Sequence, residues 1–140
     1  MNIIVKKLRF IVPTEAYRGE GLSYYFVKAL DYIRIKNSDN VASIFEEKSI
    51  PYVQGRVWTT DAMLRETVNL VNKRKAEGCI AVEMEVAGVQ AIGDFYHFDL
   101  FNFLVSGDEI TERDYQVEGL TDANHNLDKL YIALKIVERI

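Results

Sequence analysis

Residues 79–88 have the sequence Cys-Ile-Ala-Val-Glu-Met-Glu-Val-Ala-Gly, an apolar run followed at once by two carboxylates. The run 79–82 is typical of a short buried strand, and small and apolar residues recur at helical spacing from Met84 to about Tyr96. The same order of strand and helix recurs before and after this stretch. Such alternation indicates an α/β sheet covered by helices.

Further elements are predicted on both sides of this stretch. Strands are expected at residues 8–12, where Pro13 stops the run, at 53–59 and at 100–105. Helices are expected at 38–49 and from about 61 to 77. The final helix carries one apolar stripe, the pattern of a helix that packs on a core: Leu127, Leu130, Tyr131, Leu134 and Val137. We expect residues 1–140 to form one domain, a three-layer αβα sandwich with a mixed central sheet.

Composition excludes several classes of protein and of partner. With 49% hydrophobic and 27% charged residues and no repeat, the chain is neither a disordered tail, a collagen nor a coiled-coil rod. A formal net charge of −4 gives no electrostatic case for binding nucleic acid or an anionic membrane. The single cysteine, the short apolar runs and the lack of a signal peptide predict a cytoplasmic protein. No metal site is expected, because neither histidine has a second ligand at suitable spacing.

Polar residues follow two of the predicted strands directly. Glu83, Met84 and Glu85 come after the strand at 79–82, and Ser106-Gly107-Asp108 comes after the strand at 100–105. Ligands of open α/β sheets bind beyond the carboxyl ends of the strands. A carboxylate there can accept hydrogen bonds from both hydroxyls of a vicinal diol. An alternative stays open, in which the two glutamates occupy the first helical turn and only favour its dipole.

Four segments together resemble one family. Residues 81–88, Ala-Val-Glu-Met-Glu-Val-Ala-Gly, resemble the signature of purine nucleoside and uridine phosphorylases, in which Glu-Met-Glu opens a helix at the ribose site. Residues 12–25 (VPTEAYRGEGLSYY), 57–67 (VWTTDAMLRET) and 104–108 (LVSGD) are similar to three other family segments, in the family's order. The resemblance covers about residues 8 to 138 and implies a truncated phosphorylase-like fold.

The resemblance also implies roles for particular residues. Glu85 would accept hydrogen bonds from the ribose hydroxyls, Met84 would pack on the sugar, and Glu83 would line the same pocket. Asp108 would be the general acid that protonates a departing purine, although Gly107 separates it from Ser106 where purine-specific members have the two adjacent. In the alternative, Asp108 only closes the loop that follows the strand.

Three further residues are weaker candidates for contact with the base. They are Tyr24, Arg65 and Ser106, each in one of the matching segments. Adjacent aromatics such as Tyr24 and Tyr25 more often serve packing, and Arg65 beside Glu66 is equally well explained as a surface charge. The preferred base stays open, because Asp108 favours a purine whereas residues 59–62 resemble the uridine-type branch.

The activity implied by the resemblance is phosphorolytic cleavage of the N-glycosidic bond of a nucleoside, with phosphate as co-substrate and no other cofactor. Family members are much longer, and this chain resembles only their C-terminal half, without the part that binds phosphate. We therefore expect a homo-oligomer, or a heteromer with a missing N-terminal half, that takes a nucleoside or nucleobase. Two alternatives stay open: a non-catalytic nucleoside-binding or assembly module, and a hydrolase that uses water with Glu83 as base.

Overall fold

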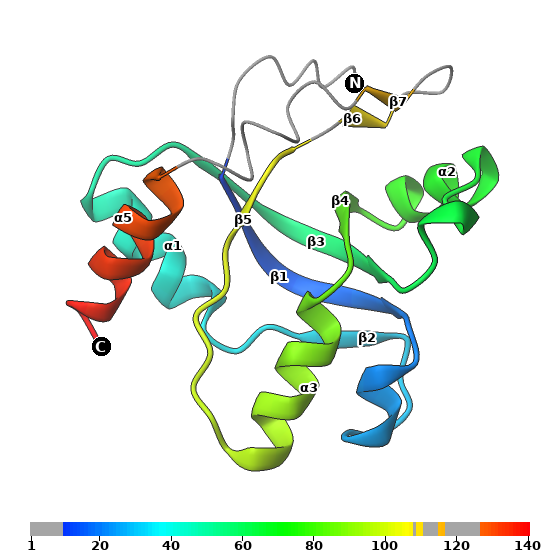
Figure 1. Ribbon diagram of the computed structural model, residues 1–140, viewed down its shortest axis with the longest axis horizontal. Helices are drawn as coiled ribbons and strands as arrows, with labels where there is room; N and C mark the ends of the chain where they lie inside the picture. The colour runs from blue at the N-terminus through cyan, green and yellow to red at the C-terminus, as the bar shows by residue number, and fades with distance from the viewer. Residues whose placement is uncertain (1–9, 108, 111–114, 117–126) are drawn as a thin grey trace.

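A computed structural model describes residues 10–107, 109–110, 115–116 and 127–140 of the chain (Figure 1). Its strands are β1 (Phe10–Gly19), β2 (Tyr32–Arg34), β3 (Tyr52–Thr60), β4 (Cys79–Glu83), β5 (Leu104–Val105), β6 (Glu109–Ile110) and β7 (Tyr115–Gln116). Its helices are α1 (Ser38–Glu47), α2 (Val68–Ala76), α3 (Val86–Tyr96) and α5 (Asp128–Val137), with short 3-10 turns η1 (Leu22–Tyr25) and η2 (Met63–Arg65). None of the helices within these ranges has the length and hydropathy needed to cross a membrane.

The central sheet is mixed, as predicted. Its strand order is β2-β1-β3-β4, and β5 also pairs with β1. Strands β1, β3 and β4 run parallel to one another, whereas β2 and β5 run antiparallel to β1. The three parallel strands therefore have their C-terminal ends at one end of the sheet, and β5 has its C-terminal end at the opposite end.

Helices cover both faces of this sheet and make three layers (Figure 1). On one face, α3 packs its Val86 and Ala87 against Ile11 and Val57 of the strands. On the other face, α1 and α5 form a second cluster that includes Val12. Because Ile11 and Val12 are successive residues of β1, their side chains point to opposite faces and each supports one layer.

Strand β1 differs from its prediction, because it runs through Pro13 and continues to Gly19. Pro13 lies between the segment paired with β5, which is Phe10–Ile11, and the segment paired with β2, which begins at Glu15. The register with β3 also shifts between Pro13 and Ala16. A bulge of this kind is a position at which a strand tolerates a proline.

Helix α5 forms where it was predicted, but the prediction of its packing face is wrong. Ile132 and Ile136 are each 3% exposed and pack with α1. The predicted stripe faces outward instead, with Leu130 at 61%, Leu134 at 54% and Val137 at 64% exposure. Both faces of α5 are apolar, so periodicity alone did not indicate which one meets the core.

The helix predicted from about residue 61 is shorter in the structure. Residues 63–65 form the separate turn η2, and α2 begins only after Thr67, whose hydroxyl accepts a hydrogen bond from the amide of Leu70 at 3.5 Å. The predicted stop at Gly78 is confirmed, since this residue has φ of +90°, a conformation that favours glycine. The strand predicted at 100–105 is confined to β5 among the described residues.

Candidate functional site

Three parallel strands end side by side, and their last residues form a polar row. Gly19 of β1 is in register with Thr60 of β3, and Thr59 of β3 is in register with Glu83 of β4. Thr59 and Thr60 are 0% and 3% exposed, so hydroxyl groups are buried where the strands end. The first predicted cluster, Glu83-Met84-Glu85, thus begins at the carboxyl ends of the parallel strands, where an open α/β sheet binds its ligand.

The Glu83 carboxylate caps helix α3. Its Oε2 accepts hydrogen bonds from the backbone amides of Glu85 and Val86, both at 2.7 Å, and its Oε1 accepts one from the Thr59 hydroxyl. A negative charge at the start of a helix is also favoured by the helix dipole. Glu83 therefore satisfies donors within the chain, which is part of the dipole interpretation that the sequence left open.

Burial raises the pKa of the Glu83 carboxyl above its ordinary value. The hydrogen bonds from Thr59 and from the amides of Val86 and Glu85 act in the opposite direction, and the neighbouring charge of Glu85 adds to the rise. Desolvation thus raises the pKa of the Glu83 carboxyl by more than its three hydrogen-bond donors lower it. Glu83 takes up a proton at higher pH than an exposed glutamate would.

Thr59 is a site residue for which the sequence analysis proposed no role. Its hydroxyl donates to Glu83 and accepts a hydrogen bond from the amide of Ala87 at 3.1 Å. One side chain therefore ties the end of β3 to both the end of β4 and the first turn of α3. The signal in the sequence was the Thr-Thr pair at the end of a predicted strand, where buried hydroxyls need partners.

Met84 and Glu85 form the turn between Glu83 and α3, and both side chains face solvent. Met84 is 46% exposed, and Glu85 is exposed and occupies the position that precedes the helix. No described residue donates a hydrogen bond to the Glu85 carboxylate, whereas the Glu85 amide is held by Glu83. The turn thus presents an exposed carboxylate, to which no described residue donates, on a backbone that Glu83 fixes.

A buried polar network holds the segment that follows β1. Arg18, 3% exposed, donates from Nε to the Ser23 hydroxyl at 2.7 Å and from Nη1 to the carbonyl oxygens of Lys28 and Leu30 at 2.6 and 3.1 Å. The Glu20 carboxylate accepts hydrogen bonds from the amide and the hydroxyl of Ser23. These contacts fix η1 against the end of β1.

The turn η1 in turn packs on α3 near the candidate site. A Cβ added to Gly88 would lie 2.9 Å from Cδ2 of Leu22, so the absence of a side chain at Gly88 permits this close contact. The amide of Gly21 also donates to Asp61 just after β3, at 3.1 Å. The ends of β1 and β3 and the start of α3 are therefore linked into one rigid unit.

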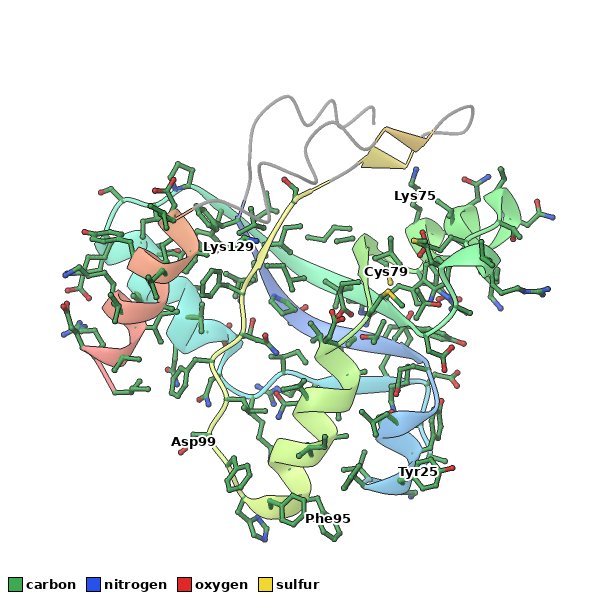
Figure 2. The ribbon with its side chains drawn as sticks, viewed as in Figure 1. Tyr25, Lys75, Cys79, Phe95, Asp99 and Lys129 are labelled. Carbon is green, nitrogen blue, oxygen red and sulfur yellow. The ribbon has the colours of Figure 1, made fainter. Side chains whose placement is uncertain are left out.

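Tyr24, a predicted base contact, lies on η1 and is already engaged. The Arg18 guanidinium carbon lies 4.0 Å from the centroid of its ring, and its hydroxyl donates to the Arg18 carbonyl at 3.2 Å. The side chain remains 43% exposed. Tyr25, at 85% exposure, lies at the end of the molecule that also carries Phe95 (Figure 2).

The structure does not place the remaining candidates beside Glu83. Arg65 is exposed on η2, just beyond the end of β3. Ser106 follows β5, whose Val105 pairs with Phe10 at the start of β1. Ser106 therefore lies at the end of the sheet where the parallel strands begin, opposite to Glu83. Asp108 lies outside the described residues. Ser106 and Glu83 therefore do not lie together, because β5 is antiparallel to the strand β1.

Elsewhere, a surface cavity of about 210 Å³ opens beside the start of α1. It is lined by Thr14, Glu15, Arg34, Ile35, Ser38 and Asp39. None of the predicted site residues borders it. Within the described part of the chain, no group of three or more histidine, cysteine or acidic side chains is placed to hold a metal ion.

Comparison with known proteins identifies the family. The model of the phosphorylase superfamily matches residues 4–136. The chain belongs to this superfamily. No curated protein sequence matches it. The matched range contains all four segments that resemble the family, at residues 12–25, 57–67, 81–88 and 104–108.

Solved structures share the superfamily fold. The purine nucleoside phosphorylase of Toxoplasma gondii in complex with immucillin-H is 19% identical with a TM-score of 0.71, over 91% of this chain and 54% of that one. The AMP nucleosidase of Bacteroides thetaiotaomicron is 18% identical with a TM-score of 0.69, over 93% and 51%. The uridine phosphorylase of Vibrio fischeri is 17% identical with a TM-score of 0.68, over 94% and 56%.

These matches establish the fold, and they include both phosphorylases and a nucleosidase. The superfamily chain described here spans little more than half the length of each of the three.

Proposed function

We propose that the chain binds the ribose of a nucleoside at the Glu83–Glu85 turn and takes part in cleavage of the N-glycosidic bond. The observation that supports this most directly is the state of the Glu85 carboxylate. It is exposed, accepts no hydrogen bond from a described residue, and stands on a backbone whose amide is held by Glu83. A preorganised acceptor of this kind suits the two hydroxyls of a sugar diol.

Met84 and Glu83 would assist Glu85 in different ways. Met84 is half-exposed beside Glu85, where its flexible thioether can pack on the apolar face of a sugar. Glu83 would act as a positioning residue, because its oxygens already accept three donors of the chain. The ribose site therefore consists of one binding carboxylate and one carboxylate that orients it.

The leading reaction is phosphorolysis. The bond between C1′ of the sugar and the base nitrogen breaks, its electron pair leaves with the base, and a phosphate oxygen forms the new bond to C1′. The base takes up a proton, for which Asp108 remains the proposed donor by resemblance. Positive charge develops on the sugar as the base departs, as in glycoside hydrolysis, and the nearby carboxylates would stabilise it.

Phosphate would have to bind away from the start of α3. The free amides at a helix start are a common anion site, but here the amides of Glu85, Val86 and Ala87 are bonded to Glu83 and Thr59. This observation favours a second candidate function, a nucleosidase in which water replaces phosphate. For phosphorolysis, we propose that a further half of a phosphorylase fold, or a second copy, supplies the phosphate site.

Binding can be tested apart from turnover. We expect isothermal titration to show saturable binding of inosine, adenosine or uridine, and weaker binding of the corresponding 2′,3′-dideoxynucleoside. Glu85→Gln should weaken nucleoside binding about ten-fold or more, since a charged acceptor of two hydroxyls is replaced by a neutral one. Glu47→Gln on α1 is the matched control and should leave affinity unchanged. Equal affinity of Glu85→Gln and the unaltered chain would contradict the ribose site.

Turnover then separates the activities. Release of free base that requires phosphate supports phosphorolysis, and release that does not require phosphate supports the nucleosidase. Saturable binding with no release of base, with or without phosphate, would identify a nucleoside-binding module instead.

A further inference from the structure

The surface cavity beside the start of α1 is separate from the candidate nucleoside site. Its volume is about 210 Å³, and its wall consists of Thr14, Glu15, Arg34, Ile35, Ser38 and Asp39. Glu15 and Arg34 point away from α3, because their neighbours Ala16 and Ile33 belong to the core cluster beneath that helix. Glu15 also precedes Gly19, the last residue of β1, by about 13 Å along the strand. A ligand in this cavity therefore does not meet the Glu83–Glu85 turn.

Arg34 brings to the cavity a positive charge that no described residue neutralises. It stands opposite Glu15 in the antiparallel register of β1 and β2, where side chains of opposite charge attract each other. The Glu15 carboxylate is bonded instead to Arg56 of β3, at 2.6 Å. Arg34 is exposed and forms no ion pair within the described part of the chain. The guanidinium is left uncommitted because its register partner is engaged elsewhere.

Asp39 brings a negative charge that is likewise unneutralised. It lies in the first turn of α1, where a carboxylate is favoured by the helix dipole, and accepts a hydrogen bond from the neutral amide of Gln54 at 3.1 Å. Lys36, three residues earlier, is paired with Asp94 at 2.8 Å. Among the described residues, Arg34 and Asp39 pair neither with each other nor with a third charge. The wall therefore presents one free charge of each sign.

Uncharged groups complete the wall. The Ser38 side chain is 5% exposed, and its oxygen accepts a hydrogen bond from the Gln54 amide at 3.0 Å. No described residue accepts the hydrogen of the Ser38 hydroxyl in turn. Buried hydroxyl groups normally have all their partners, from the protein, water or a ligand. Ile35, 2% exposed, adds an aliphatic side chain, so the cavity offers an open donor and an apolar contact beside its two charges.

We propose that this cavity binds a free α-amino acid with a small aliphatic side chain, in its zwitterionic form. The ligand carboxylate accepts hydrogen bonds from the Arg34 guanidinium, whose parallel N–H groups match its two oxygens, and from the Ser38 hydroxyl. The ligand ammonium pairs with Asp39, and the aliphatic side chain contacts Ile35. Both free charges of the wall are then neutralised by one molecule.

Ligands of a single charge fit this wall less well. An anion at Arg34 lies near the unpaired carboxylate of Asp39, and a cation at Asp39 lies near the unpaired guanidinium, so each meets a like charge. Size also limits the choice. The cavity is smaller than the ~300–1,000 Å³ of pockets that enclose drug-sized ligands, which suits a molecule smaller than a nucleoside.

Titration of the full chain with L-alanine, followed by backbone amide NMR shifts, tests the proposal. We expect saturable shifts at Arg34, Ser38 and Asp39 with a dissociation constant of about 1 mM or below. Propionate lacks the ammonium group and ethylamine lacks the carboxylate, so each should bind at least about ten-fold more weakly. Shifts that do not saturate by about 20 mM L-alanine, or equal affinity for propionate or ethylamine, would overturn the proposal.

Removal of one charge at a time tests the assigned residues. Arg34→Gln and Asp39→Asn should each raise the dissociation constant for L-alanine about ten-fold or more, because one end of the zwitterion loses its counter-charge. Arg139→Gln, at an exposed arginine beyond α5, is the matched control and should leave that constant unchanged. Circular dichroism verifies that the variants fold. Unaltered affinity in either cavity variant would contradict the assignment.

The outcome is independent of the nucleoside site. Arg34→Gln should bind inosine as the unaltered chain does, and Glu85→Gln should keep its affinity for L-alanine. Loss of L-alanine binding in Glu85→Gln would place the amino acid at the wrong site and overturn the assignment of the cavity.

Discussion

The strands β4 and β5 are both followed by polar residues, but their C-terminal ends lie at opposite ends of the sheet. Each strand is followed at once by polar residues, Glu83-Met84-Glu85 in one case and Ser106-Gly107 in the other. Strand β4 is parallel to its neighbour, so its end meets the ends of β1 and β3, whereas β5 is antiparallel to β1. Strand direction, more than local composition, therefore decides which polar residues converge.

The two ends also differ in how they are held. Glu83 is bonded to Thr59 and to the start of α3, so the turn after β4 is fixed by three donors. Ser106 lies beyond a two-residue pairing with β1. The difference makes the end of β4 the place where substitutions should affect stability and ligand binding together.

The largest effect is expected from removal of the Glu83 carboxylate. Glu83→Ala would leave two amides of α3 and the Thr59 hydroxyl without an acceptor, and should lower the free energy of unfolding by about 3 kcal/mol. Glu85→Ala, at an exposed side chain, should change it by less than about 0.5 kcal/mol. Urea unfolding followed by circular dichroism compares the two. Equal losses would show that Glu83 does not cap α3.

A smaller loss is expected at Thr59. Thr59→Val should cost about 1–2 kcal/mol of unfolding free energy, because Glu83 and the amide of Ala87 lose a buried partner. It should also raise the pKa of Glu83 further, since the hydrogen bond from Thr59 lowers it. Thr59→Ser retains the hydroxyl and should restore most of both quantities. NMR titration of the Glu83 carboxyl measures the pKa, and an identical value in the valine variant would contradict the contact.

The effect of pH should be smaller still. Because burial raises the pKa of Glu83, the stability gained from its protonation is fully present below the ordinary value of 4.5 and is lost as pH rises through the folded-state pKa. The stability of the unaltered chain relative to Glu83→Gln should therefore fall as pH rises above the ordinary value of 4.5. Urea midpoints measured for both proteins across this range give the difference. A difference that grows with pH would mean that the pKa is lowered.

The smallest effect is expected at the other strand end. Ser106→Ala should leave nucleoside affinity within about two-fold of the unaltered chain, because Ser106 and Glu85 lie at opposite ends of the sheet. Isothermal titration beside Glu85→Gln makes the comparison direct. A loss at Ser106 as large as that at Glu85 would place both strand ends at one ligand.

Elements with a strong periodic pattern were predicted well from the sequence. The strands at 53–59 and 79–82 and the helix ended at about Tyr96 correspond to β3, β4 and α3. Helix α3 begins two residues later than predicted, because the Glu83 carboxylate caps it from the end of the strand. The existence of these elements follows from local spacing, but this cap depends on a side chain outside the helix.

Features that depend on contacts between distant residues were not predicted. Strand β2 has only three residues, too few for a periodic signal, and it forms because it pairs with β1. The antiparallel direction of β5 and the buried face of α5 are likewise set by packing. At the candidate site, the sequence predicted that Glu83 and Glu85 lie where a strand gives way to a helix, and in the structure Glu83 ends β4 and Glu85 precedes α3. The distinct tasks of the two residues depend on Thr59, which lies 24 residues before Glu83.

Trp58 gives the protein a built-in optical reporter. It is the only tryptophan of the sequence, is 5% exposed, and stands in register with Tyr17 of β1 and Val82 of β4. Its indole nitrogen lies so near Gly19 that a Cβ there would be 2.6 Å away. Because it directly precedes Thr59, its fluorescence will follow the packing of the three strand ends without any label. One emission spectrum can thus monitor both unfolding and occupancy of the candidate site.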